Sequence, residues 1–161
     1  MVFILKIMKE KLVLIFILFL FTLQGCDKIG AGSYQYAQIY SLGYSRDKVI
    51  TAIQTFKSQN PIICPPDTLE FKDGYKKDTN GNDITIWYYV FYYYPEQGIY
   101  VITFIRDDSA IGLVSIRKTI GGNIQTAQLI NHDIPGSEND SIKNEFVTRI
   151  LNPVKRILAG Q

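Results

Sequence analysis

Histidine and cysteine are scarce in this chain of 161 residues, which contains one histidine and two cysteines. A structural zinc site takes about four Cys or His ligands, so this composition excludes one. His132 lies beside Asp133, and a histidine next to a carboxylate can act as a base. No serine or cysteine, however, lies in a nucleophile motif such as Gly-x-Ser-x-Gly. We therefore expect His132 on the surface of a loop, no catalytic residue and no enzymatic activity.

An excess of basic charge is also absent once the start of the chain is set aside. Of 17 Lys and Arg residues three precede Cys26, and of 15 Asp and Glu residues one does, so residues 26–161 carry 14 of each sign. Affinity for nucleic acids comes largely from cationic side chains that neutralise phosphates. A formally neutral domain is therefore not expected to bind nucleic acid.

The acidic residues do not have the spacing of metal ligands. The segment from Asp78 to Asp83 has the composition of a calcium loop, but Gly81 is at the fourth place instead of the sixth. The twelfth place is Tyr89 instead of glutamate. A second polar group near a predicted helix start is interpreted as an ordinary helix cap: Asp133, Glu138, Asn139 and Asp140. We expect neither a metal nor another cofactor.

The apolar run at residues 12–21 is too short to span a membrane. A transmembrane helix needs about 20 apolar residues, whereas a shorter run behind basic residues is typical of a signal peptide. Lys6, Lys9 and Lys11 supply those basic residues. The segment ends in Leu23, Gln24, Gly25 and Cys26.

This ending resembles the lipobox of a bacterial lipoprotein precursor, with Leu at the third position before Cys26 and Gly directly before it. The resemblance implies cleavage before Cys26, a diacylglyceryl thioether on its sulfur and acylation, for example by palmitate, of the new amino terminus. Several acyl chains anchor a protein stably in a membrane. The alternative is an uncleaved membrane anchor. Both interpretations place the domain in the bacterial cell envelope, and they leave open whether the inner or the outer membrane holds it.

The chain accordingly divides into three parts. Residues 1–25 are the signal peptide, residues 26–44 the lipidated Cys26 and a tether, and residues 45–161 a single domain, because this length suffices for one domain and not for two. With Cys26 acylated, Cys64 has no partner for an internal disulfide. Its apolar, proline-bounded surroundings predict a buried packing residue.

The segments 84–94 and 99–105 are rich in β-branched and aromatic residues and are separated only by residues 95–98. Pro95 favours an early turn position, and Gly98 supplies the positive φ that such a short connection often needs. The pattern predicts an antiparallel hairpin in which Tyr94 lies opposite Ile99.

This pairing gathers aromatic side chains on one face of the hairpin, called here the aromatic face: Trp87, Tyr89, Phe91, Tyr93 and Tyr100. We favour the interpretation that the aromatic face is the core under the helices, because aromatic stacks in small sheets mostly serve packing. The alternative is a binding site, in which the rings stack on sugars or on side chains of a partner. In both cases two short helices leave one face of the sheet partly uncovered.

The remaining elements predict an α+β fold. A helix is expected after Ser45, because Val49, Ala52, Ile53 and Phe56 have helical spacing. A second helix is expected from Ser137, with Asp140 completing a capping box and Pro153 kinking or restarting it. Further strands are expected at residues 69–72 and 110–118, and a short one within 124–130. The result is an antiparallel sheet of four to five strands with an N-terminal and a C-terminal helix packed on one face.

Together these features predict a lipid-anchored, non-enzymatic module that binds another envelope protein, as an assembly subunit or as a toxin-neutralising protein. The alternative function is binding of carbohydrate or peptidoglycan through the aromatic face.

Overall fold

The structure is a computed structural model, and it describes residues 34–67, 71–77 and 79–161. Residues Tyr36–Gln161 form one compact unit. The signal segment 1–25 and Cys26 lie outside the described residues, as do Leu69 and Asp78. Within the described part of the chain, no helix combines the length and the apolar character that crossing a membrane requires.

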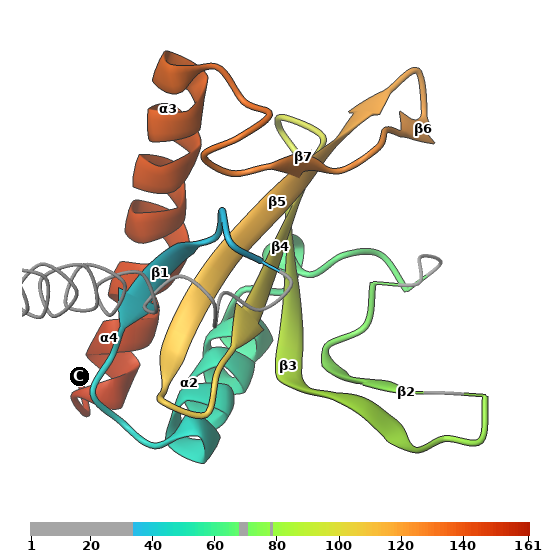
Figure 1. The fold of residues 1–161 in the computed structure, drawn as a ribbon. Coiled ribbons are helices and arrows are strands. Elements are labelled where there is room, and N and C mark those ends of the chain that lie inside the picture. Colours follow the sequence, from blue (N-terminus) through green and yellow to red (C-terminus); the bar gives the residue numbers. More distant parts are fainter. Residues whose placement is uncertain (1–33, 68–70, 78) are drawn as a thin grey trace, which may run out of the picture. The chain divides into compact units, whose positions relative to one another are not determined.

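An antiparallel sheet forms the centre of this unit, and the fold is α+β as predicted (Figure 1). The strand order is β1-β5-β4-β3-β2, and two short strands, β6 and β7, also pair with β5. The strands of the described residues are β1 (Gln38–Ser41), β2 (Gly74–Lys77), β3 (Asp83–Tyr94), β4 (Ile99–Ile105), β5 (Ala110–Ile120), β6 (Asn123–Ile124) and β7 (Gln128–Leu129).

The predicted hairpin is confirmed at the level of its register. Strands β3 and β4 pair over seven positions, from Tyr88 opposite Ile105 to Tyr94 opposite Ile99. In the connection, Gly98 has a φ of 62°, a left-handed conformation that glycine adopts without a steric cost. The residue type at position 98 therefore allows the tight return that brings the two aromatic strands together.

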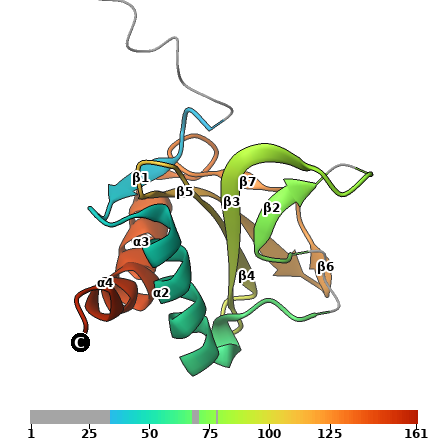
Figure 2. The ribbon, with the colours of Figure 1, turned by 90° about the horizontal axis from the view of Figure 1, so that it is seen from below.

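The helices lie together on one side of the sheet (Figure 2). They are α2 (Arg46–Gln59), α3 (Gly136–Phe146) and α4 (Asn152–Leu158), with a π-helical segment, Val147–Leu151, between α3 and α4. The predicted apolar stripe of α2 is buried, and α2 and α4 pack against each other. Because α3, the π-helical segment and α4 follow one another without a gap, residues 136–158 are helical throughout.

The helix ends differ from the prediction in two details. Pro135, not Ser137, occupies the N-cap of α3, and neither Pro135 nor Ser45 makes a side-chain capping bond. Pro153 lies in the first turn of α4, in agreement with the predicted restart, but the N-cap of α4 is Leu151 and the chain enters this helix through the π-helical segment. The N–H of Asn152 donates to the oxygen of Val147, five residues back, and this wider turn continues the helix up to a proline that lacks its own N–H.

The helices cover the aliphatic face of the sheet, so the favoured interpretation of the aromatic face as the core under the helices is wrong. The cluster under the helices contains Val90, Val101 and Ile105 from the hairpin. Tyr88, Tyr92 and Tyr94 are the aromatic residues of the hairpin on this face, and Tyr92 and Tyr94 are fully buried. The residues of the aromatic face alternate with these along β3 and β4 and are therefore on the other side of the sheet, where the described part of the chain has no helix (Figure 2).

Strand β5 explains this choice of face. Opposite Tyr100, Ile102 and Phe104 it places Arg117, Ser115 and Gly112, which are charged, polar or small. On the helix side it places Ile111, Leu113 and Ile116, all fully buried. Only the aliphatic face therefore continues as an apolar surface across the sheet. A register shift between Ile102 and Thr103 lets odd and even residues of β5 share that face.

Three strand assignments also differ. The outer strand next to β3 is β2, Gly74–Lys77, and the described part of the predicted strand 69–72, Phe71 and Lys72, is not in a strand. The predicted fifth strand is split into β6 and β7. Strand β1 was not predicted, and it pairs with β5 from Gln38 opposite Leu113 to Ser41 opposite Ala110.

Candidate binding face

The structure brings the five residues of the aromatic face together. Tyr93 stacks on Tyr100 across the hairpin, with ring centroids 4.6 Å apart and an interplanar angle of 25°. Tyr89 and Phe91 follow along β3 at a centroid distance of 6.5 Å. Because β3 residues two apart share a face, their rings form a row along the strand. This row is a surface of flat apolar groups with phenol hydroxyls at intervals.

Trp87 belongs to a stack built over a glycine. Its ring lies 4.9 Å from the ring of Phe104, at an angle of 19°. Phe104 in turn lies on the backbone of Gly112, so closely that a Cβ added there would be 2.3 Å from a ring carbon. Phe104 is 2% exposed. The sequence pattern places Phe104 on the same face of the hairpin as Trp87, but Phe104 was not among the predicted site residues. Its pairing with Gly112 was missed, although an aromatic residue opposite a strand glycine is a recognised cross-strand pairing.

Phe71 is a further member of this face that the sequence prediction missed. Its ring lies 5.4 Å from that of Phe91 and 5.2 Å from that of Tyr100. The guanidinium of Arg117 lies 5.7 Å from the Phe71 centroid, within the range of a cation–π contact. No local pattern indicates this arrangement, because Phe71 precedes β2 and reaches the face only through the fold.

A polar network fixes the Phe71 segment to the edge of β3. Asp73 accepts a hydrogen bond from the Phe91 N–H at 3.0 Å, and its other oxygen lies 2.6 Å from Nζ of Lys57. Lys57 also donates to the Phe91 oxygen at 2.9 Å. The two side chains thus satisfy the edge groups of Phe91 where β2 no longer pairs with β3. They hold Phe71 beside the rings of Phe91 and Tyr100.

The aromatic face has a buried inner layer and a partly exposed outer layer. Tyr100 is 5% exposed, like Phe104 a packing residue, whereas Tyr93, Phe91, Tyr89 and Trp87 are half-buried. Half-buried aromatic rings offer a partner a large, rigid contact area at a small cost in side-chain entropy. The rings of this surface can stack on flat or apolar groups of a ligand, and the tyrosine hydroxyls can donate hydrogen bonds to it.

His132 lies in a different part of the unit. Its ring is 4.2 Å from that of Tyr36, and Nδ1 is 2.6 Å from a carboxylate oxygen of Asp133. The Leu129 N–H, and after it His132, lower the pKa of the Asp133 carboxyl. The side-chain amide of the neighbouring Asn131 donates a hydrogen bond to the backbone carbonyl oxygen of Tyr36 at 3.1 Å. These contacts attach the start of the compact unit to this loop.

The other candidates from the sequence take structural positions. Cys64, predicted to be buried, is half-buried and free, with Sγ 3.9 Å from the Lys57 oxygen. Asn139, from the polar group near α3, exchanges hydrogen bonds with Asn131. The described residues contain no group of three or more His, Cys, Asp or Glu that could hold a metal ion.

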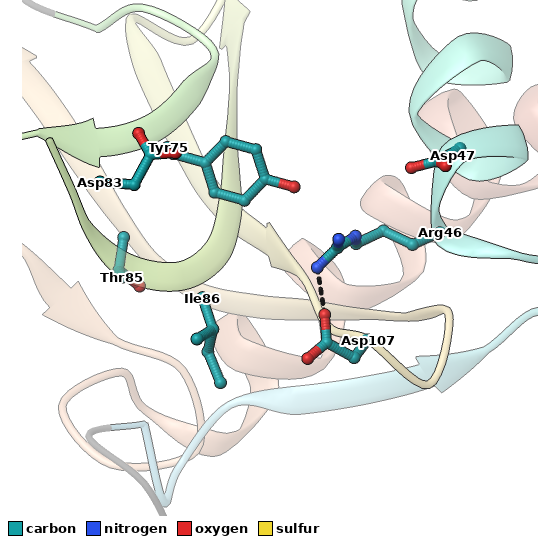
Figure 3. A pocket seen from close by; sticks show the side chains of 7 residues that line it. All are labelled: Arg46, Asp47, Tyr75, Asp83, Thr85, Ile86 and Asp107. Atoms are coloured by element: carbon teal, nitrogen blue, oxygen red, sulfur yellow. Dashed lines mark hydrogen bonds and ion pairs between the residues drawn. The ribbon is translucent and has the colours of Figure 1, made fainter.

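An open cleft of about 700 Å³ lies between the start of α2, the β2–β3 hairpin and the β4–β5 turn (Figure 3). Its lining residues are Arg46, Asp47, Tyr75, Asp83, Thr85, Ile86 and Asp107. Arg46 extends across the cleft to an ion pair with Asp107, and its guanidinium lies 5.8 Å from the Tyr75 ring. Arg46 is therefore already neutralised by Asp107, and the described residues that line the cleft form no group of three or more His, Cys, Asp or Glu side chains that could hold a metal ion.

No protein-family model, no curated protein and no solved structure matches this chain. Its function is therefore inferred from its own residues and geometry.

Proposed function

We propose that this protein is a lipid-anchored, non-enzymatic binding module of the bacterial cell envelope that binds another envelope protein through its aromatic face. The lipobox-like ending at Cys26 supports the anchor and the compartment. Several acyl chains on Cys26 would hold the domain at a membrane surface. The residues between Cys26 and the compact unit, which begins at Tyr36, would reach roughly 30 Å if fully extended.

One observation carries the binding role. The aromatic face is on the side of the sheet that none of the described helices covers, and it presents a row of half-buried rings on a hairpin. Aromatic residues are enriched at the cores of protein interfaces, where they supply much of the binding energy. A role in packing alone would not require the outer rings to remain partly exposed.

Site-specific photocrosslinking tests the binding role. A benzophenone amino acid in place of Tyr93 is expected to give one specific crosslinked protein in intact cells. The same group in place of Lys155, an exposed residue of α4, provides the control. Failure to crosslink at position 93, or the same product from both positions, would count against the aromatic face as the docking surface.

Carbohydrate binding through the same rings is the alternative outcome. A pull-down on insoluble peptidoglycan separates the two, because retention on the glycan that is lost with Trp87→Ala would favour the carbohydrate function.

The anchor is tested separately by Cys26→Ser. This change removes the acylated sulfur and is expected to shift the protein from the membrane fraction to the soluble fraction. An unchanged membrane fraction together with an uncleaved N-terminus would refute lipidation and support the uncleaved anchor.

A further inference from the structure

Arg117 is a partly buried cation on the aromatic side of the sheet. It lies on β5 opposite Tyr100, on the same side of the sheet as the aromatic row. Its Nε atom is buried and has no hydrogen-bond partner among the described residues. Its guanidinium carbon lies 5.7 Å from the centre of the Phe71 ring. A buried donor without an acceptor costs free energy, so this position requires an explanation.

The other cations of the described residues show how unusual Arg117 is. Lysines and arginines without a carboxylate partner are otherwise exposed at the surface, such as Lys72 and Arg156. Each of the remaining partly buried cations forms an ion pair: Arg46, Lys57, Arg106, Lys118, Lys143 and Arg149. Within the described part of the chain, Arg117 is therefore the partly buried cation that has no carboxylate.

We propose that Arg117 is the anchor for a carboxylate of the bound partner, and that the aromatic face therefore recognises an extended acidic segment of a protein. This inference rests on the proposed function and specifies its ligand. A guanidinium presents a planar fork of N–H donors that matches a carboxylate in a bidentate pair. The Phe71 ring lies over the guanidinium and would shield such a pair from part of the solvent, which strengthens it.

The geometry of the aromatic row favours a peptide as the carrier of this carboxylate. Tyr89, Phe91 and Tyr93 are spaced by two residues along one strand, which corresponds to about 6.5–7 Å. Side chains on one face of an extended peptide repeat at the same distance. A segment lying along β3 can therefore place apolar side chains on successive rings and an acidic side chain at Arg117.

Selection from a phage-displayed library of random peptides tests this inference without knowledge of the natural partner. The target is the full-length protein, immobilised in detergent. Enriched peptides are expected to carry Asp or Glu together with apolar side chains at alternate positions. Arg117→Gln is expected to weaken binding of a selected peptide by roughly 10- to 100-fold, the range for a hydrogen bond to a charged group.

Two variants serve as controls. Lys118→Gln removes the adjacent cation, which points to the other face and pairs with Glu138, and it is expected to leave peptide affinity unchanged. Arg117→Lys keeps the charge and loses the planar fork, so it is expected to bind with intermediate affinity even if Arg117→Gln fails to fold. Emission of Trp87 and the thermal midpoint report whether each variant is folded.

Two results would overturn the inference and leave the proposed function intact: enriched peptides without acidic residues, or equal binding to Arg117→Gln. A selection that enriches no peptide would also overturn the inference. The proposed function is tested separately by crosslinking at position 93, which does not depend on an acidic ligand. Competition by a soluble peptidoglycan fragment with a muramic acid carboxylate, lost in Arg117→Gln, would assign the anion site to a glycan and overturn the assignment to a peptide.

Discussion

Gly112 is the position where a single methyl group is expected to disturb the aromatic face most directly. A Cβ at this residue would lie 2.3, 2.6 and 2.8 Å from three ring carbons of Phe104. Phe104 cannot turn freely to avoid it, because it is 2% exposed and its other neighbour, Trp87, stacks on it at 4.9 Å. Gly112→Ala must therefore displace the ring, the strand or both.

The expected loss follows from two opposing effects. Overpacking of a filled site costs about 1–3 kcal/mol, and a contact as short as 2.3 Å places this change in the upper part of that range, at about 2–3 kcal/mol. Replacing a glycine in a strand recovers about 0.5–1 kcal/mol of conformational entropy, since Gly112 does not have a positive φ. The net destabilisation of Gly112→Ala is thus about 1–2 kcal/mol, which corresponds to a fall in Tm of roughly 3–10 °C for a domain of this size.

The single tryptophan of the chain makes the assay specific. Denaturation followed by Trp87 emission gives the free energy of unfolding, and the native emission spectrum reports movement of the stack. Gly136→Ala is the matched control, because a Cβ at Gly136 meets nothing within 4 Å and Ala is the better residue in a helix. A double variant with Phe104→Leu should lose less stability than the sum of its single changes. A neutral or stabilising Gly112→Ala would refute the close packing of Phe104 on this glycine.

Other changes probe the rest of the fold. Asp73→Ala leaves Lys57 without its carboxylate and the Phe91 N–H without its acceptor. Denaturant titration should therefore show that the free energy of unfolding falls by about 2–4 kcal/mol, and the Phe91 amide should exchange its hydrogen faster. The Tyr92 hydroxyl is buried and has no partner among the described residues, so Tyr92→Phe should be neutral or raise stability by about 1 kcal/mol. A loss of stability of more than about 1 kcal/mol would show instead that this hydroxyl forms a stabilising hydrogen bond. Burial raises the pKa of Tyr92 and Tyr94, so both favour the folded state below their unfolded pKa of 10.0, and this contribution should disappear as the pH rises above it. Tyrosinate absorbance that rises for all tyrosines near pH 10, without loss of the far-UV signal, would contradict that coupling.

Much of the architecture could be predicted because local patterns determine it. Val49, Ala52, Ile53 and Phe56 share a helix face by spacing alone, and all four are buried. The short connection from Pro95 to Gly98 favours the register with Tyr94 opposite Ile99, which the structure has. Spacing and turn length act within a few residues, so a sequence shows them directly.

The choice of the covered face could not be predicted from the hairpin alone, because both of its faces are apolar. The deciding residues, Gly112, Ser115 and Arg117, are on the neighbouring strand β5. The register shift near Val114 interrupts the alternation of β5, so counting odd and even residues assigns part of that strand to the wrong face. Phe71 and the Lys57–Asp73 pair were missed for a related reason, since their contacts join segments that only the tertiary fold brings together.

The two layers of the aromatic face imply that stability and binding can be separated by mutation. Tyr100 and Phe104 are almost completely buried, so their loss should unfold the sheet before it reveals anything about a partner. Tyr93 is half-buried and stacks on Tyr100 from the outer layer. Tyr93→Ala therefore removes part of the area offered to a partner and leaves the inner layer, Tyr100 and Phe104, unchanged. We expect this variant to remain folded and to lose peptide binding. If Tyr93→Ala instead unfolds the protein as Tyr100→Ala does, the aromatic face is a second core and the docking surface must lie elsewhere.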